Sequence, residues 1–352
     1  MRQKDSGKEA LLIQPICNKK KDTMSQYTKG FDVPILLVIF NRPEWTREVF
    51  EAIRRVRPQQ LFIGGDGPRS DHPEDADLCN KARAVAEMVD WDCKVCTQFH
   101  NTNMGCRMGP VSAINWFFSQ IEYGIILEDD IVPVPSFFHF CEEMLVKYRG
   151  ISNIGMVSGC NPFDVQTNKE ESYHFSSYTK TWGWATWAQV WNRYYDVTGE
   201  RYLSVLPEIR ARRPLTKKFH KWWWTNLELT LNHGFDAWDF QWELAHYAND
   251  LLIIRPKANL IKYIGVGDNA THSFSVHKAY TKIAELEFPL VHPKSICWDK
   301  KADLKLEKSL SGSGLLKQFL YLPWRTLRYI LRKSGIYKPR ISDSYARILN
   351  KR

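Results

Sequence analysis

The 352-residue sequence contains no apolar run that approaches the length needed to cross a lipid bilayer. The apolar stretch at residues 10–13 is shorter than the core of a secretory signal peptide and is interrupted at Gln14. The sequence alone therefore predicts a cytoplasmic protein that does not span a membrane.

Paired cysteine motifs are scarce. The eight cysteines are scattered, and Cys93-x-x-Cys96 has no second pair at the spacing of a zinc finger. We expect free thiols in a reducing compartment. The pattern disfavours a disulfide framework and a cysteine-based zinc or redox site.

The body of the chain has no net positive charge, although the formal net charge of the whole chain is +10. Residues 1–30 carry a net +4 and residues 311–352 a net +9, which leaves about −3 for residues 31–310. A body of this charge is not expected to bind nucleic acid.

What the chain has is an apolar run that breaks into acids. Residues 123–135 read Y-G-I-I-L-E-D-D-I-V-P-V-P, which is typical of a buried strand stopped by two prolines. Three carboxylates at the end of such a strand repel one another, and Mg²⁺ or Mn²⁺ is the usual counter-charge. The alternative is an acidic turn that happens to follow a core strand.

Hydrophobic periodicity predicts alternating strands and helices. We expect strands at 34–40, 61–63, 95–99, 125–132, 154–159 and 251–254, and helices over 44–56, 82–88 and 110–121, the last with Pro110 in its first turn. This order predicts an α/β fold with a Rossmann-like, open, mostly parallel sheet flanked by helices.

In such sheets, ligands bind at the carboxyl ends of the strands. The loops expected there contain Arg42, Asp66, Arg107 and the acids 128–130. Guanidinium groups suit phosphate, and the glycines around Asp66 and before Arg107 allow close backbone approach. Each loop alone is an ordinary turn; four in succession indicate a nucleotide site.

The second half of the chain is rich in aromatic residues, with nine of the fourteen tryptophans between residues 182 and 242. Buried aromatics are usually core, but flat rings also suit sugars, and we expect at least one of these tryptophans to contact a sugar. Asp239 and Glu243 would share one face of a helix and are the candidate general bases, with Asp236 as a third; a solvated helix face is the alternative.

Taken together, these pieces resemble nucleotide-sugar glycosyltransferases of the A-type fold, specifically those similar to N-acetylglucosaminyltransferase I. The pieces are V-I-F-N-R-P at 38–43, G-G-D-G-P at 64–68, N-x-N-x-G-x-R at 101–107, L-E-D-D at 127–130, W-G-W-A-T-W at 182–187, Trp238-Asp239 and G-D-N-A-T-H at 267–272. The likeness spans residues 33–275. The segment after Trp238 is looser than the eukaryotic pattern, and bacterial surface-polysaccharide enzymes match better.

The resemblance implies a role for each position. Asp130 would ligate Mn²⁺ or Mg²⁺, with His272 as a second ligand to the metal or the diphosphate. Asp129 would face the ribose and Glu128 the donor sugar. The remaining implied contacts are Asp66 with the pyrimidine, Arg42 and Arg107 with the phosphates, Asp239 as base with Glu243 as runner-up, and Trp182, Trp184 and Trp238 with the sugar or acceptor.

The last segment has a different composition. From residue 311, apolar residues alternate with Lys and Arg in a basic amphipathic pattern, which favours attachment to an anionic membrane surface over a core helix or a nucleic-acid contact. We divide the chain into a basic leader (1–30), a nucleotide-sugar half (31–160), an acceptor half (161–300) and a membrane-associating tail (301–352).

The leading hypothesis is a metal-dependent, inverting glycosyltransferase on the inner face of the plasma membrane. It would move a sugar from a nucleoside-diphosphate donor, with UDP favoured, to a glycan or lipid-linked acceptor. The alternatives are a sugar nucleotidyltransferase, which usually has a glycine-rich loop after its first strand, and a carbohydrate- or membrane-binding protein without activity.

Overall fold

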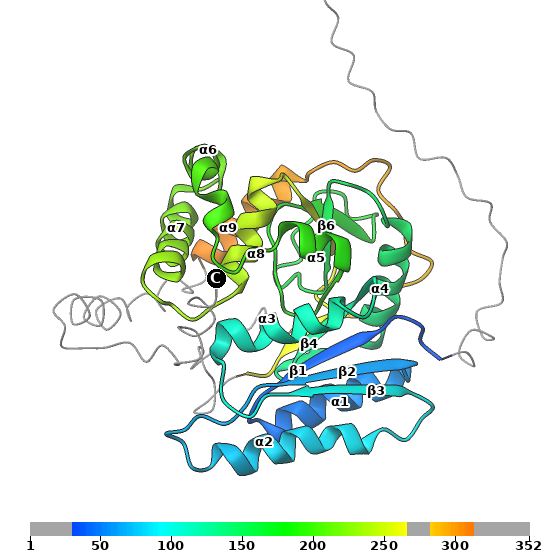
Figure 1. The fold of residues 1–352 in the computed structure, drawn as a ribbon. Helices are drawn as coiled ribbons and strands as arrows, with labels where there is room; N and C mark the ends of the chain where they lie inside the picture. Colours follow the sequence, from blue (N-terminus) through cyan, green and yellow to red (C-terminus); the bar gives the residue numbers. More distant parts are fainter. Residues whose placement is uncertain (1–29, 266–281, 313–352) are drawn as a thin grey trace, which may run out of the picture.

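The computed structural model describes residues 30–265 and 282–312 (Figure 1). Its largest feature is an eight-stranded sheet in the order β3-β2-β1-β4-β8-β6-β9-β7, beside a two-stranded sheet of β5 and β10. The strands are β1 (Ile35–Ile39), β2 (Gln60–Gly65), β3 (Lys94–Phe99), β4 (Tyr123–Glu128), β5 (Ile131–Pro133), β6 (Ile154–Ser158), β7 (Tyr173–Ser176), β8 (Trp184–Trp187), β9 (Leu252–Pro256) and β10 (Ile261–Tyr263). The α-helices are α1 (Pro43–Val56), α2 (Asp75–Arg83), α3 (Gly105–Phe118), α4 (Pro135–Lys147), α5 (Ala188–Tyr194), α6 (Leu206–Arg212), α7 (Lys217–Asn232), α8 (Asp239–Ala248) and α9 (Lys300–Gly312), with 3-10 helices η2 (Ala84–Met88) and η3 (Glu200–Val205).

The predicted α/β architecture is confirmed at this level. Strands β3, β2, β1 and β4 are parallel neighbours, as the alternation of strands and helices predicts. The second half makes the sheet mixed, because β8 runs antiparallel to both β4 and β6 and β7 runs antiparallel to β9. Sequence periodicity identifies strands but does not fix which neighbour each one chooses.

Two hydrophobic cores lie on opposite faces of the sheet. On one face, alternate residues of β1 such as Ile35 and Leu37 pack with α1 and α4; on the other, Leu36 packs with α3 and with the aromatic residues of the second half. Figure 1 shows α1 and α2 below the first strands and α3 above them. Because a strand covered on both faces must be apolar throughout, β1 reads as a continuous hydrophobic run.

Three predicted elements differ from the structure. The helix expected over 82–88 is the end of α2, which begins at Asp75, followed by the 3-10 helix η2. The helix expected from Pro110 begins at Gly105, so Pro110 lies inside α3. The strand expected over 125–132 breaks at the acids: β4 ends at Glu128, and β5 leaves the main sheet to pair with β10, with Ile131 opposite Tyr263. The break takes Asp129 and Asp130 out of the ladder and into a turn.

The folded body extends at least to residue 312, which moves the expected boundary at 301. α9 packs against α7 and β7, and two of its carboxylates, Asp303 and Glu307, are fully buried. In Figure 1, α9 lies with α6, α7 and α8 above the first strands. Residues 1–29 and 313–352, which include the predicted leader and most of the predicted tail, lie outside the described residues.

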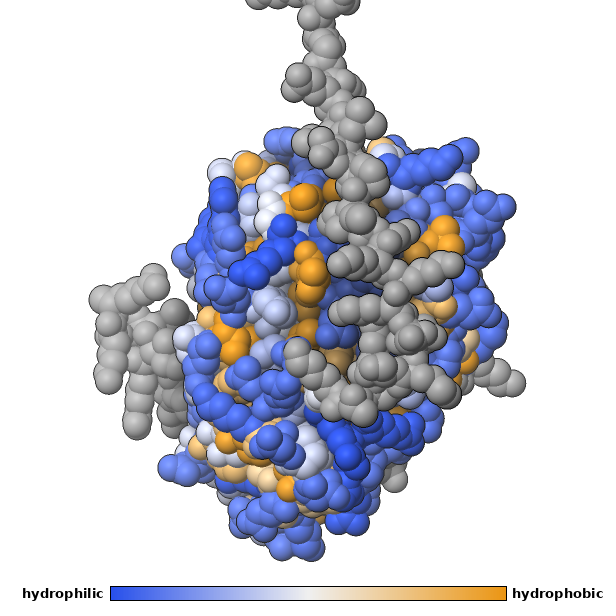
Figure 2. Space-filling model, turned by 90° about the vertical axis from the view of Figure 1, so that its right-hand side faces the viewer, coloured by the Kyte–Doolittle hydropathy of each residue, from blue (hydrophilic) through white to orange (hydrophobic). Residues whose placement is uncertain are grey.

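None of the helices within 30–265 and 282–312 is both long and apolar enough to cross a membrane. Figure 2 shows that, on the face it presents, hydrophobic residues form separate patches within a mostly hydrophilic surface.

Candidate functional site

The site begins where β1 and β4 end, and a buried ion pair joins these two strands. Arg42 donates from Nη1 to Asp129 Oδ1 at 2.8 Å, and the same nitrogen lies 3.9 Å from Asp130 Oδ2. The backbone N–H of Phe40 donates to the other oxygen of Asp129 at 3.2 Å. Asp129 is therefore fixed by the loop after β1, in line with the sequence-based expectation that the two loops meet.

The other two acids, Glu128 and Asp130, lie where burial and neighbouring carboxylates disfavour their ionised forms. Burial raises the pKa of Glu128 well above its usual range, and the charges of Asp130, Asp129 and Asp239 raise it further. Burial and the charge of Asp129 likewise raise the pKa of Asp130, and Arg42 offsets only part of this effect. The guanidinium of Arg42 is therefore the positive charge that offsets three neighbouring acids, and a bound cation would stabilise the ionised forms of these acids.

Asp239 lies close enough to Glu128 to interact with it electrostatically, although the two are 111 positions apart. Asp239 is the first residue of α8, and its charge contributes to the raised pKa of Glu128. This arrangement brings the predicted base and the predicted nucleotide-binding acids together.

Glu243, one turn further along α8, has different surroundings. Its Oε2 accepts a hydrogen bond from Trp223 Nε1 and its Oε1 one from Tyr247 Oη, both at 2.8 Å. Burial raises the pKa of Glu243 to about 7, and the nearby Asp239 adds to this rise against the two hydrogen bonds. Both oxygens are held by aromatic partners, whereas the sequence treats Glu243 and Asp239 as equivalent candidates.

The carboxylate of Asp66 is hydrogen-bonded to neighbouring loop residues of the protein. It accepts the backbone N–H groups of Gly67, Met104 and Gly105 and the side-chain amide of Asn103. Burial raises its pKa to about 6 against these hydrogen bonds. In this structure Asp66 ties the loop after β2 to the loop after β3, beside the expected pyrimidine site.

Arg107 does not reach toward a phosphate in this structure, contrary to the sequence-based expectation. Its guanidinium donates to three backbone carbonyls, those of Thr230 (2.7 Å), Phe235 (2.5 Å) and Ala237 (3.0 Å). The residue is 9% exposed. A guanidinium matches a group of carbonyl oxygens as well as it matches phosphate, so the residue type alone predicts the charge but not the partner.

The three tryptophans expected to contact sugar differ in exposure. Trp184 is fully buried and Trp238 nearly so: Trp184 packs against Trp238 and Trp242, and Trp238 packs against Trp191, so their placement in the core does not favour the predicted sugar contacts. Trp182 is only partly buried. It stacks on Tyr263 with ring centroids 4.4 Å apart and 7° between the planes.

Lys180 is a residue that sequence reasoning missed. Its Nζ lies 3.5 Å from the centroid of the Trp182 ring. Burial lowers its pKa, and the neighbouring charges of Cys160, Asp239 and Glu243 oppose this effect. A single lysine in an irregular segment gives no local sequence pattern that marks it as a site residue. Its position two residues before Trp182 is the one hint in the sequence that the two side chains lie together.

Cys106, also missed, lies among the charged groups of the site. Burial raises the pKa of its thiol to about 12; the charges of Asp236 and Glu128 raise it further, and that of Arg42 opposes them. The thiol therefore stays neutral, within electrostatic range of Arg42 in the loop after β1 and of Glu128 at the end of β4.

The metal expectation rests on Asp130 and His272, and His272 lies outside the described residues. Within the described ranges, no three His, Cys, Asp or Glu side chains converge in a metal-binding arrangement. Asp130 itself fits such an ion, because its carboxylate is buried beside Asp129 and the charge of Arg42 offsets only part of the resulting rise in its pKa. Mg²⁺ and Mn²⁺ commonly take only one or two protein carboxylates and complete their shell with phosphate and water.

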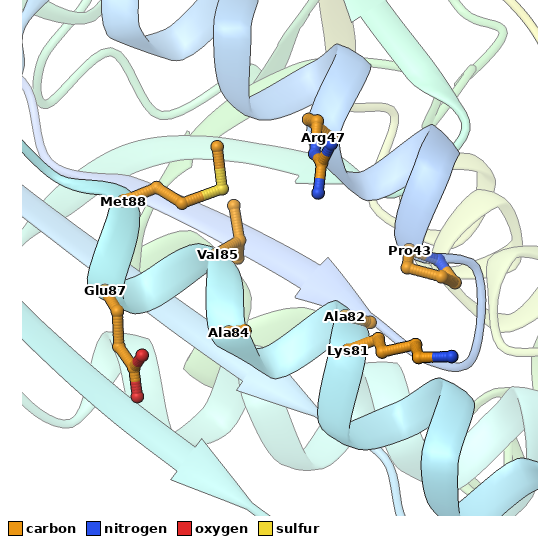
Figure 3. Close-up of a pocket in the computed structure, with 8 residues that line it drawn as sticks. All are labelled: Pro43, Arg47, Lys81, Ala82, Ala84, Val85, Glu87 and Met88. Atoms are coloured by element: carbon orange, nitrogen blue, oxygen red, sulfur yellow. The ribbon is translucent and has the colours of Figure 1, made fainter.

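A separate hollow of about 360 Å³ lies between α1 and the α2–η2 segment (Figure 3). Its lining residues are Pro43, Arg47, Lys81, Ala82, Ala84, Val85, Glu87 and Met88. None of the acids at 128–130 or on α8 contributes to it, so we place the candidate site at the strand ends and not in this hollow.

Comparison with known proteins adds no assignment. No protein-family model matches the chain, and no significantly similar sequence was found among curated proteins.

Proposed function

We propose that this protein is a nucleotide-sugar glycosyltransferase of the A-type fold. It would transfer a sugar, with inversion, from a nucleoside-diphosphate donor, UDP favoured, to a hydroxyl of a glycan or lipid-linked acceptor. The observation that carries the proposal is the meeting of the loop after β1 with the acids at the end of β4, where Arg42 Nη1 lies 2.8 Å from Asp129 and 3.9 Å from Asp130, with Asp239 in electrostatic range of Glu128.

The described residues suit a single displacement. The acceptor oxygen attacks the anomeric carbon, the bond from that carbon to the diphosphate oxygen breaks, and the diphosphate leaves with the electron pair. Asp239 takes the proton of the acceptor hydroxyl. Glu128 faces the donor sugar, and Arg42 and Asp129 hold the nucleotide end.

Two further groups support the donor and the acceptor. Asp130, with His272 as the second predicted ligand, would hold Mn²⁺ or Mg²⁺. When bound, such an ion neutralises charge on the leaving diphosphate. Trp182 has Tyr263 stacked on one ring face and Lys180 Nζ over the other, so the partly exposed edge of its indole is the part that can contact a sugar. Tyr263 lies near Asp130. A Cβ added to Gly265 would lie 2.5 Å from Asp130 Oδ2 and 2.7 Å from Tyr263 Oη, so both oxygens border the same small space.

The test is a calorimetric titration with UDP, with and without Mn²⁺. We expect binding that requires the ion and that weakens at least about tenfold in Asp130→Asn, because a metal ligand is lost. The matched control is Asp77→Asn, which changes an acid with a 68% exposed side chain on α2 and should bind like the parent.

Two results would count against parts of the proposal. Binding that is equally tight without the ion would remove Asp130 from the metal role. Failure of the parent protein to bind UDP, GDP and dTDP in turn, with Mn²⁺ present, would overturn the transferase assignment.

A further inference from the structure

Arg107 and Asp236 connect the first turn of α3 with the segment before α8, which together form one junction. Arg107, on α3, donates to the carbonyls of Thr230, Phe235 and Ala237. Asp236, in the segment before α8, accepts the backbone N–H groups of Cys106 at 2.7 Å and Arg107 at 3.1 Å. Each segment thus supplies a side chain that binds the backbone of the other.

Both charges of this pair match the helix ends that they meet. Asp236 stands at the N-terminus of α3, where backbone N–H groups lack helical partners and negative charge is favoured. Arg107 binds the carbonyl of Thr230 in the last turn of α7, where positive charge is favoured. The two side chains therefore serve two helix ends as well as each other's backbone.

The junction leaves no room for a side chain at Gly105. Gly105 has a φ of +86°, and a Cβ added to it would lie 2.5 Å from Asp236 Oδ2. Asp66 accepts the N–H groups of Met104 and Gly105 on the other side. A continuous series of contacts therefore leads from the end of β2 through residues 103–107 to the segment that precedes Asp239.

We propose that Arg107 and Asp236 form a clasp that positions Asp239 against the nucleotide-binding half. The proposal rests on the proposed function, in which Asp239 is the base. Asp239 follows Asp236 by three residues, and α3 packs on β1 and β2. Arg107 is accordingly a positioning residue and not a ligand of the nucleotide.

The distinction can be tested with two arginines that both bind backbone carbonyls. Arg83 donates to the carbonyls of Asp66 and His100 within the nucleotide half, so Arg83→Met is the matched control for Arg107→Met. We expect faster amide hydrogen exchange over residues 233–242 in Arg107→Met and not in Arg83→Met.

Binding and turnover then separate positioning from ligation. In Arg107→Met, the affinity for UDP with Mn²⁺ should change by less than about threefold. The kcat for release of UDP from the sugar donor that the parent uses should fall about 100-fold, because a base displaced by about 1 Å loses its alignment. The acid limb of the pH–kcat profile should move, and Arg107→Lys should restore part of kcat.

Several outcomes would overturn the clasp. Loss of UDP affinity in parallel with kcat would make Arg107 a nucleotide ligand, and unchanged exchange over 233–242 would show that the contacts do not hold the segment. If Arg107→Met does not fold, Asp236→Asn takes its place with the same readouts. A parent without nucleotide binding would refute the proposed function alone, since the exchange comparison still decides whether the clasp holds Asp239.

Discussion

Asp239 and Glu243 carry the same functional group on one helix, but their surroundings differ. Glu243 is held at both oxygens by Trp223 and Tyr247. Asp239 interacts with Glu128 at the end of β4. The sequence places both acids on one helix face and cannot separate them, because their partners come from residues 4 to 111 positions away.

Substitution of the two acids should give different kinetic results. Asp239→Asn should lower kcat by about 10²- to 10⁴-fold, because an amide cannot accept the hydroxyl proton. UDP affinity should be retained. Glu243→Gln should cost about tenfold or less, because only the support of α8 is disturbed.

Steady-state transfer assays with UDP titrations check these values. Glu228→Gln, on the neighbouring helix α7, removes an acid whose side chain is 68% exposed and controls for altered charge. A larger loss in Glu243→Gln than in Asp239→Asn would exchange the roles of the two residues.

The indoles show the same limit of sequence reasoning. Trp182 and Trp184 are two residues apart in W-G-W, yet one is partly exposed and the other fully buried. The aromatic density of residues 182–242 correctly indicates a large aromatic core. Which ring borders the candidate site depends on Tyr263, which stacks on Trp182 from β10.

Among the secondary-structure elements that the sequence did not foresee, α9 is the one that moves the predicted domain boundary. Asp303 accepts hydrogen bonds from Ser176 Oγ (2.6 Å), Ser177 N (2.9 Å) and Trp298 Nε1 (2.6 Å). Glu307 accepts the backbone N–H groups of Leu215 and Thr216. These buried polar contacts fasten α9 to the body next to the segment that leads to Lys180 and Trp182.

Removing the Asp303 carboxylate should destabilise the fold. Asp303→Ala leaves several buried donors without an acceptor, and we expect a loss of about 3 kcal/mol in the free energy of unfolding. Lys305→Ala changes an exposed residue of the same helix and should lie within about 0.5 kcal/mol of the parent.

Urea unfolding followed by circular dichroism measures both variants. Equal stability of Asp303→Ala and Lys305→Ala would mean that α9 is not held by its buried acid. The outcome also bears on the domain boundary, since a stabilising α9 belongs to the body.

At the scale of the whole molecule, charge separates the body from the ends of the chain. Residues 311–352 carry ten Lys or Arg and one acid, and their apolar residues favour a membrane surface. The described residues end at 312 with α9 packed against the body, so residues 313–352 can be removed without cutting a described helix.

Deletion of residues 313–352 should abolish flotation with vesicles that contain anionic lipid. Thermal unfolding and UDP binding should remain those of the parent. Replacement of Arg325, Arg328, Arg332 and Lys333 by Gln should weaken binding by about 10²- to 10³-fold, because each cation near an anionic surface contributes about 1 kcal/mol.

Vesicles of neutral lipid provide the control, since they should retain little of the parent protein. If the truncated protein floats with anionic vesicles as the parent does, the membrane contact lies on the body and the tail proposal is wrong.

The sequence by itself determined the order of strands and helices in the first half and the position of the acids at a strand end. Apolar runs must be continuous where a strand is covered on both faces, and proline or glycine must follow where it ends. The tertiary structure alone decided that β8 inserts antiparallel between β4 and β6, that Arg107 binds carbonyls 123 to 130 positions away, and that Asp239 meets Glu128. Such choices depend on which distant groups the packed sheet brings together, and a local pattern of residues contains no record of them.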